Sequence, residues 1–442
     1  MTDAMHNTSV HPFRVHPGRS LLVILGIVAL LLSVTVGIAE VYLRLTVPFI
    51  TTNWPGRFDP RFGDNFIPGE ILHWTNGVDF WTRTRANSLG FLDREPPEAP
   101  PDSGCRVLFI GDSIVQASQV PIEKKSHVIF ETLAREQLPA LGVETVALGS
   151  TGTGQANQLA YYERFGPGLQ PDVVVLVVAG NDLANNSPLL ESLRYGWHPG
   201  HLPRLFFVVT PDGDHIARQA IDPDWKQYRL SEPYKAQRPA HQYLNEHGYS
   251  YNWLYTHIER HLPALAGLIS GQSSASYVAT RMRDIENLDG FEEAYAEWDY
   301  PDDLDMNHMF HAADPLPPVF RQALQLTGHA LDEFQHRAQA DGFHLLMLAA
   351  YNVTRHYAPG TVRMGRSMRD RGAFLRLEEL AAARDIPLID QYGYILEQGG
   401  DPGEARFSVD RHWSEQGHVW AAEAVLEYFR HNPQLCSTTG QL

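Results

Sequence analysis

Five residues of this chain are of types that together could carry out acyl chemistry: Ser113, Gly152, Asn181, Asp410 and His412. A serine hydroxyl becomes a good nucleophile only when a base takes its proton, and a histidine with an ordinary pKa of about 6.5 suits that task. A carboxylate beside the histidine fixes the tautomer of the ring and stabilises its protonated form. The chemistry expected is nucleophilic acyl transfer, with Ser113 as nucleophile, His412 as base and Asp410 as the acid that orients the base.

The carbonyl oxygen attacked by a serine becomes negatively charged and needs hydrogen-bond donors. The candidates for this oxyanion hole are the backbone N–H groups of Ser113 and Gly152 and the side-chain amide of Asn181. Glycine at position 152 lets the backbone approach a substrate without a Cβ in the way. Losing one such donor typically costs about 3 kcal/mol of transition-state stabilisation. The neighbouring Asp112 and Asp182 are expected to brace their loops rather than to catalyse.

These residues follow apolar segments that have the character of buried β-strands. The segments are residues 106–110, 145–148, 172–178, 345–349 and 386–389, and helical patterns lie between them. Uninterrupted β-branched runs are typical of strands buried on both faces, and strand–helix alternation predicts a parallel sheet covered by helices on both sides. We therefore expect a doubly wound α/β fold with three layers. Because sites in such sheets form beyond the carboxyl ends of the strands, the candidate residues are expected to meet there.

The order of these motifs resembles that of the SGNH, or GDSL-type, hydrolase superfamily. Ser, Gly, Asn and His define four blocks in that family, and the matching positions here are Ser113, Gly152, Asn181 and His412. The resemblance covers about residues 106–182 and 318–430. It implies a flavodoxin-like sheet and esterase, lipase, thioesterase or carbohydrate O-acyl chemistry.

The last block departs from the usual pattern of the family. Asp410 stands two residues before His412, whereas the family usually has three, and Trp413 follows. This Asp-x-His-Trp block is similar to that of SGNH-like alginate O-acetylation proteins, which favours acyl groups on glycans. The membrane segment is similar to that of anchored bacterial members.

An uninterrupted apolar segment, Leu21–Ala39, lies near the start of the chain. Its length as a helix is about 28 Å, close to the thickness of a bilayer core. Arg14 and Arg19 precede it, so residues 1–20 are expected in the cytoplasm, residues 21–45 as a single-pass anchor, and the rest on the extracytoplasmic, periplasmic side. A cleaved signal peptide ending near Ala39 is the main alternative, and a buried core helix is the third.

Two regions interrupt the expected α/β pattern. Residues 46–104 are rich in turn formers and Trp, and we expect a pre-domain that wraps the core. Residues 105–442 would form the hydrolase domain, with an insertion at about 183–315 that is rich in Trp and Tyr. Residues 206–217 look like a hairpin. The aromatic residues of the insertion either fill a small core of its own or form a lid that stacks on sugar rings.

Charge and cysteine content limit the classes of partner. With 35 Lys and Arg against 52 Asp and Glu, the net charge is −17, which argues against nucleic acid and against a polybasic contact with anionic lipid. The two cysteines, Cys105 and Cys436, are expected at the same edge of the sheet, opposite the site, and a disulfide between them is an open possibility outside the cytoplasm.

The leading hypothesis is a membrane-anchored serine esterase that acts on ester-linked acyl groups of a glycan or a lipid, with no metal and no dissociable cofactor. An acceptor hydroxyl in place of water would make it an O-acyltransferase of envelope polysaccharide. A non-catalytic glycan-binding or scaffold subunit is the alternative from another class, and a lipid-directed lipase or thioesterase is a narrower one. The sequence does not indicate the acyl group, the oligomeric state or any protein partner.

Overall fold

A parallel sheet of five strands forms the centre of the structure. In spatial order the strands are β11 (Leu388–Asp390), β10 (His344–Ala350), β7 (Val173–Ala179), β5 (Cys105–Gly111) and β6 (Val143–Gly149). Of these five strands, β5 comes first along the chain and lies between β6 and β7, the second and third. This is the flavodoxin-like, doubly wound order. Every residue of β5 and β7 is buried, as their apolar sequences predict. The predicted fold class is confirmed.

The computed structural model describes residues 17–59, 61–97, 104–188, 190–191, 204–209, 216–220, 238–271, 316, 318–350, 372–410 and 412–436. Much of the expected insertion, including residues 272–315, lies outside these ranges.

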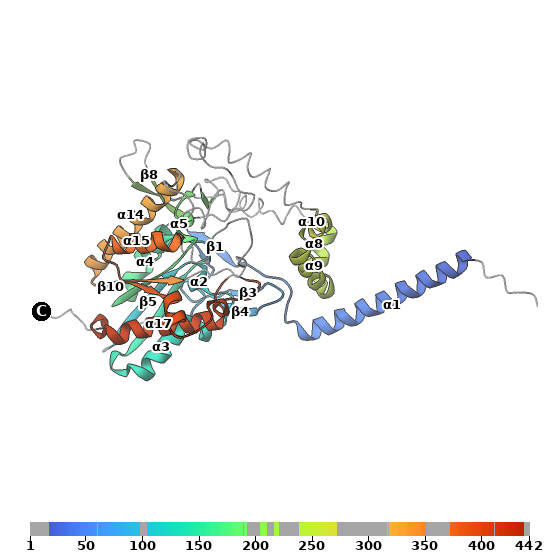
Figure 1. Cartoon of the computed structure of the whole chain (residues 1–442), viewed down its shortest axis with the longest axis horizontal. Helices are drawn as coiled ribbons and strands as arrows, with labels where there is room; N and C mark the ends of the chain where they lie inside the picture. The colour runs from blue at the N-terminus through green and yellow to red at the C-terminus, as the bar shows by residue number, and fades with distance from the viewer. Residues whose placement is uncertain are drawn as a thin grey trace, which may run out of the picture.

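Helices cover both faces of the sheet (Figure 1). One face packs against α4 (Gln155–Leu169), α14 (Pro318–Asp341) and α15 (Gly372–Ala382). The other face packs against α3 (Ser126–Gln137) and α17 (Glu415–His431). The shorter helices α2 (Ser113–Gln116), α5 (Asp182–Asn185) and α16 (Gln391–Glu397) follow β5, β7 and β11.

The pre-domain wraps around the edge strand β6. It contains two antiparallel hairpins, β1 (Gly56–Asp59) with β2 (Gly63–Phe66) and β3 (Ile71–Thr75) with β4 (Trp81–Arg85). Its contacts reach both the α4 face and the α3 face of the body.

On the α4 face, Phe62 and Phe91 of the pre-domain join the main core, and the Phe62 and Phe165 rings lie 5.3 Å apart. The hydroxyl of Tyr161 donates to the backbone oxygen of Asp64 at 2.5 Å. Aromatic burial and a satisfied buried hydroxyl thus attach the pre-domain to this face.

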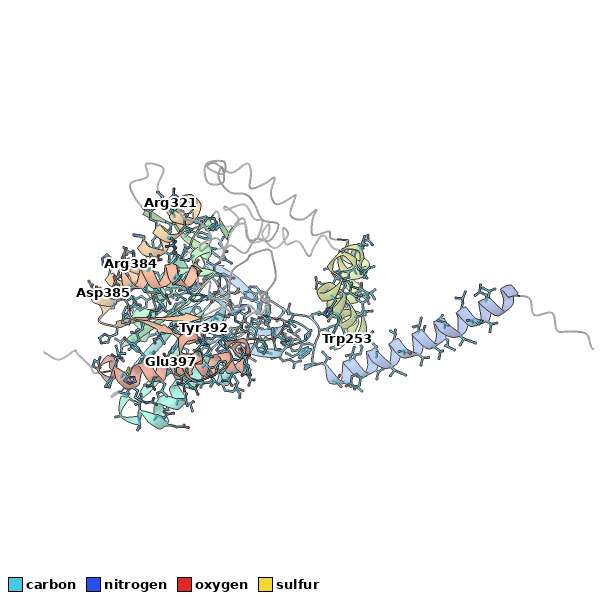
Figure 2. The ribbon with its side chains drawn as sticks, viewed as in Figure 1. Trp253, Arg321, Arg384, Asp385, Tyr392 and Glu397 are labelled. Atoms are coloured by element: carbon cyan, nitrogen blue, oxygen red, sulfur yellow. A yellow bond between two sulfur atoms is a disulfide. The ribbon has the colours of Figure 1, made fainter. Side chains whose placement is uncertain are left out.

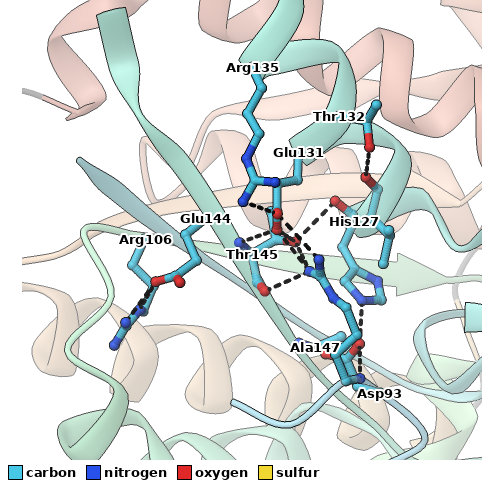
Figure 3. Close-up of polar contacts among 11 residues, drawn as sticks. Asp93, Arg106, His127, Glu131, Thr132, Arg135, Glu144, Thr145 and Ala147 are labelled. Atoms are coloured by element: carbon cyan, nitrogen blue, oxygen red, sulfur yellow. Dashed lines mark hydrogen bonds and ion pairs between the residues drawn. The ribbon is translucent and has the colours of Figure 1, made fainter. Parts of the chain in front are cut away.

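At the edge of β6, carboxylates cap backbone N–H groups that no neighbouring strand pairs (Figure 3). Asp93 accepts from the Ala147 nitrogen at 2.8 Å, and Glu131 of α3 accepts from the Thr145 nitrogen at 2.9 Å. Arg94 donates to Glu131 and to the Thr145 oxygen. An uncapped edge of this kind would be free to pair with another chain, so these contacts also protect the sheet.

The expected hairpin in the insertion is present, with strands β8 (Leu205–Val209) and β9 (Ile216–Ala220). Leu205 and Phe207 belong to the main core, next to α4 and α14. Three further helices of the insertion, α8 (Pro239–His247), α9 (Tyr249–His261) and α10 (Pro263–Ser270), lie away from the five-stranded sheet, beside the N-terminal helix and the turn between β3 and β4 (Figure 1).

The N-terminal helix α1 (Pro17–Thr46) projects away from the body (Figure 1). Its segment Leu21–Thr46 has a mean hydropathy of 2.9 and none of it is buried, so it is long and apolar enough to span a membrane or to be a signal sequence. At the other end of the sheet, Cys105 and Cys436 form a disulfide with a Cα–Cα distance of 5.0 Å.

Candidate active site

Ser113 opens the short helix α2 directly after β5. The preceding Asp112 caps this helix, because its Oδ1 accepts from the Ile114 nitrogen at 2.9 Å. A Cβ at Gly149 would lie only 2.2 Å from the Gln116 nitrogen, so α2 packs directly on the end of β6. The sheet edge therefore holds the serine at the carboxyl ends of the strands.

His412 and Asp410 approach Ser113 from the loop before α17. The Nε2 atom of His412 lies 2.8 Å from the Ser113 Oγ, and its Nδ1 atom lies 2.5 Å from the Asp410 Oδ1. Asp410 also accepts from the His412 backbone nitrogen at 2.8 Å, so the two-residue spacing still lets one carboxylate hold both the ring and the backbone. The His412 side chain is 33% exposed, so the site is open to solvent.

Asp79, in the turn between β3 and β4, binds the loop that carries Asp410. Its carboxylate accepts from the backbone nitrogens of Val409 and Asp410, both at 2.9 Å, and from the Ser408 hydroxyl at 2.7 Å. Burial alone would raise the pKa of Asp79, but these donors and Asn76 bring it below its usual range. The turn between β3 and β4 thus fixes the loop on which Asp410 lies.

The pKa of Asp410 is also lowered. Partial burial acts to raise it, and the hydrogen bonds from His412 and from the Gln119 side chain more than offset that effect. Asp410 is therefore ionised at neutral pH, which is the state in which a carboxylate can accept a hydrogen bond from the Nδ1–H of a histidine such as His412.

The predicted oxyanion donors lie on loops beside α2. The Thr151 nitrogen donates to the Gln116 side chain at 2.8 Å, which ties the Gly152 loop to the nucleophile helix. Gly152 has a φ of +66°, which disfavours other residues, and a Cβ there would lie 2.4 Å from an Arg204 nitrogen and would displace that side chain. Within the described residues, no hydrogen bond uses the backbone N–H of Ser113 or Gly152.

The side-chain amide of Asn181 is bound by two neighbouring side chains. Its Nδ2 donates to the Asp112 Oδ2 at 2.8 Å and to the Asn185 Oδ1 at 2.7 Å, which uses both amide hydrogens. Asn181 therefore fixes Asp112 in this state, and donation to an oxyanion requires one of these hydrogen bonds to be exchanged. The Ser113 Oγ lies 3.4 Å from the same Asp112 oxygen, so the exchange would occur next to the nucleophile.

Asp182 is fully buried behind Asn181. Burial, together with the charge of Asp112, raises its pKa well above the usual range, although the Gln155 amide donates to it at 2.6 Å. A neutral carboxyl in this place braces the loop that follows β7.

A buried lysine supports the other end of α2. The Lys125 Nζ donates to the backbone oxygens of Leu92 and Gln116, at 2.5 and 2.6 Å. Burial lowers its pKa to about 8, with the charge of Asp93 acting in the opposite direction. Sequence patterns give no signal for Lys125 or Asp79, because their partners are distant along the chain.

Trp413 packs beneath the loop that carries His412. Trp413 is buried and packs edge-on against His418, with ring centroids 5.2 Å apart, so it supports the loop from below. Among the residues that the structure describes, no three His, Cys, Asp or Glu side chains are grouped to hold a metal ion.

Comparisons with known proteins give structural neighbours only. No protein-family model matches the chain, and neither does any curated protein. The solved structures that are similar to it include the acetyl xylan esterase AlAXEase, with 12% identity over 73% of this chain and 98% of that chain and a TM-score of 0.34. Axe2, an acetylxylan esterase from Geobacillus stearothermophilus, has 14% identity over 74% of this chain and 94% of its own, with a TM-score of 0.34. TesA has 13% identity over 74% and 98%, with a TM-score of 0.34.

Proposed function

We propose that this protein is a serine esterase of the SGNH type that cleaves ester-linked acyl groups through an acyl-Ser113 intermediate. The observation that carries the proposal is the continuous set of contacts from Asp410 through His412 to the Ser113 hydroxyl, at 2.5 and 2.8 Å. This is the geometry in which a base can take the proton of a serine while an acid holds the base.

The proposed reaction has two stages. The Ser113 Oγ attacks the ester carbonyl as its proton moves to the His412 Nε2, and the N–H groups of Ser113 and Gly152 stabilise the oxyanion. Collapse breaks the bond to the alcohol, which leaves with the proton from His412. A water molecule then gives a proton to His412 and attacks the acyl-serine. As the acyl bond to the Ser113 Oγ breaks, His412 returns the proton to that oxygen, which releases the carboxylic acid and restores Ser113.

The proposed substrate is a glycan that carries small O-acyl groups such as O-acetyl. The support is the Asp-x-His-Trp block and the partly exposed site, in which a bulky polymer can reach the serine. An acceptor hydroxyl in place of water at the second stage would give acyl transfer from the same intermediate.

We propose further that α1 anchors the protein and that the catalytic body lies on the extracytoplasmic side. The arginines before the apolar segment support this orientation, and so does the Cys105–Cys436 disulfide, which is typical of oxidising compartments. Protease added to intact spheroplasts should then degrade the body and spare cytoplasmic proteins.

The test is covalent labelling of the full-length protein in mild detergent with a fluorophosphonate, followed by peptide mass spectrometry. The adduct is expected on Ser113, with none in Ser113→Ala and at most about a thousandth of the labelling rate in His412→Ala. Ser88→Ala, at an exposed serine of the pre-domain, is the matched control and should label normally. A folded protein that takes no label, or takes it elsewhere, would refute the serine mechanism.

A further inference from the structure

The helices α8, α9 and α10 form a helical unit (residues 238–271) that has a small interior of its own. The Arg238 nitrogen donates to the Ser270 oxygen at 2.8 Å, so the two ends of the unit meet. Inside it, the His241 ring lies 4.3 Å from the Tyr255 ring, and the His241 Nδ1 lies 2.9 Å from the Tyr251 hydroxyl. The unit is therefore an ordered element and not an open loop.

The helical unit presents its large apolar side chains outward. On α10 the small residues Ala266 and Ser270 are buried, whereas Leu265 and Leu268 on the helix and Leu262 at its N-cap are 42%, 68% and 55% exposed. These leucines recur every three residues and therefore lie on one face of the helix. A helix in water buries its leucines, and an outward face of this kind marks an interaction surface. Small residues inside and leucines outside are the arrangement of helices that pack in lipid.

The other two helices of the unit add aromatic and apolar side chains to its surface. Trp253 and Leu254 on α9 and Tyr243 and Leu244 on α8 are all exposed. Tryptophan and tyrosine are enriched where a protein meets the headgroups of a bilayer, because their rings are apolar with a polar edge.

The helical unit is bound to α1 at the point where the apolar segment ends. Glu40, the first charged residue after Ala39, accepts from the Tyr249 nitrogen at 3.1 Å and from the nitrogen and hydroxyl of Ser250 at 2.8 and 2.7 Å. Arg44 donates to the His247 oxygen at 2.6 Å and lies 4.8 Å from the centre of the Tyr249 ring.

These contacts set the height of the unit relative to a bilayer. If α1 spans the membrane, Glu40 lies at its outer surface. Trp253 follows Ser250 by three residues on α9, which is about 5 Å along the helix, so it lies near the same level. Figure 2 shows Trp253 at the end of the unit that is next to α1.

We propose that the helical unit is a membrane-docking surface that rests on the outer leaflet beside α1, with Trp253, Leu254, Leu262, Leu265 and Leu268 inserted at the boundary between headgroups and acyl chains. The proposal depends on the anchor orientation given under Proposed function. Recognition is apolar: Arg238 and Arg260 balance Glu246 and Glu259, so the unit has no net charge with His neutral, and it requires no anionic lipid. Two attachments, α1 and this surface, would then hold the catalytic body at a fixed orientation to the membrane.

The test uses the full-length protein in vesicles of neutral phosphatidylcholine, with a spin label at one introduced cysteine at a time. The native cysteines are bridged and take no label. Leu254→Cys and Leu268→Cys report on the proposed surface, Val34→Cys on α1, and Leu396→Cys on the body. Leu396 is a matched control because it is 51% exposed and Leu254 is 52% exposed.

At positions 254 and 268, collisions of the label with oxygen are expected to exceed those with a water-soluble nickel complex severalfold, as at position 34, while position 396 shows the reverse. The pattern should be unchanged in 0.5 M salt.

Lipid contact at 34 with water contact at 254 and 268 would overturn the docking surface and leave the anchor intact. Water contact at all four positions would overturn the anchor and the docking surface together. Protection of 254 and 268 in native membranes but not in pure vesicles would assign this face to a protein partner and overturn the lipid proposal. Hydrolysis by the body is measured separately and bears on neither result.

Discussion

The pre-domain and the helical unit both lie outside the doubly wound pattern, yet they attach to the rest of the chain in opposite ways. The pre-domain buries Phe62 and Phe91 in the main core and gives its carboxylates Asp79 and Asp93 to the body. The helical unit binds α1 through polar groups and turns its leucines outward.

The comparison separates residues that build the catalytic body from residues that orient it. A segment that buries aromatic rings and satisfies backbone N–H groups contributes to the stability and geometry of the body. A segment whose apolar side chains stay exposed contributes little to the stability of the fold. Its apolar surface is available to contact a lipid bilayer. If this division is right, substitutions in the two segments of the full-length protein in mild detergent should differ in their effects.

The largest effect is expected from Phe62→Ala in the pre-domain. This ring is fully buried against Tyr161 and Phe165, so its loss leaves a cavity in the main core. The free energy of unfolding should fall by about 3–5 kcal/mol, measured by urea denaturation with intrinsic fluorescence. Ile67→Ala, at an exposed apolar residue of the same segment, should change it by less than about 0.5 kcal/mol. Equal effects would mean that the pre-domain is not part of the core.

Asp79→Ala should lower kcat by about 10- to 30-fold with a small change in KM. Three donors from residues 408–410 lose their acceptor, so Asp410 and His412 are held less well in the geometry for proton transfer. The control is Asp59→Ala, which removes a carboxylate of the pre-domain that pairs with Arg61 at the surface. Steady-state hydrolysis of an acetyl ester gives both constants. An unchanged kcat in Asp79→Ala would show that the acid loop keeps its geometry without the pre-domain.

Asp93→Asn should lower the free energy of unfolding by about 2 kcal/mol at neutral pH. Burial alone would raise the pKa of Asp93, but His127, Lys125 and the Ala147 N–H bring it to about 2. Because this pKa is below the usual 3.8, the stabilisation is complete above pH of about 4 and is lost as the pH falls toward 2.

The difference between wild type and Asp93→Asn should therefore shrink over that pH range. Asp59→Asn is the control: its pKa is also lowered to about 2, mainly by the side chain of Arg61, but the pair is at the surface. Its effect should be a few tenths of a kcal/mol and should vanish in high salt. A difference for Asp93→Asn that stays constant down to pH 2 would contradict the buried ionised carboxylate.

The parts of the fold that depend on local patterns could be predicted from the sequence. Strands such as β7, VVVLVVA, are apolar at every position because both faces are covered, and that pattern is visible without a structure. The positions of Ser113 and His412 are predicted from short motifs, one directly after a strand and the other just before the last helix. Whether they act as nucleophile and base stays a prediction until labelling is done.

What could not be predicted depends on contacts between residues far apart in the chain. Asp79 binds the nitrogen of Asp410, 331 residues later, and no local pattern encodes that pair. The engagement of the Asn181 amide by Asp112 is likewise a matter of side-chain geometry, which the family resemblance does not specify. On α10, composition alone does not say which side faces its neighbours, and only the structure shows that the leucines are outside.

The smallest effect on stability is expected from Leu268→Gln in the helical unit. A small effect would show that this leucine does not pack against the rest of the protein. A leucine that packed inside the protein would cost several kcal/mol on such a change, because burial would be lost and a polar amide left without partners. Leu268 is 68% exposed, so the free energy of unfolding measured with urea in detergent should change by less than about 0.5 kcal/mol. Leu205→Gln in β8, a buried leucine of the same insertion, should lower the free energy of unfolding by several kcal/mol under the same conditions. A large loss for Leu268→Gln would mean that the outward face of α10 packs against protein, and the division between body and orienting unit would then fail at this residue.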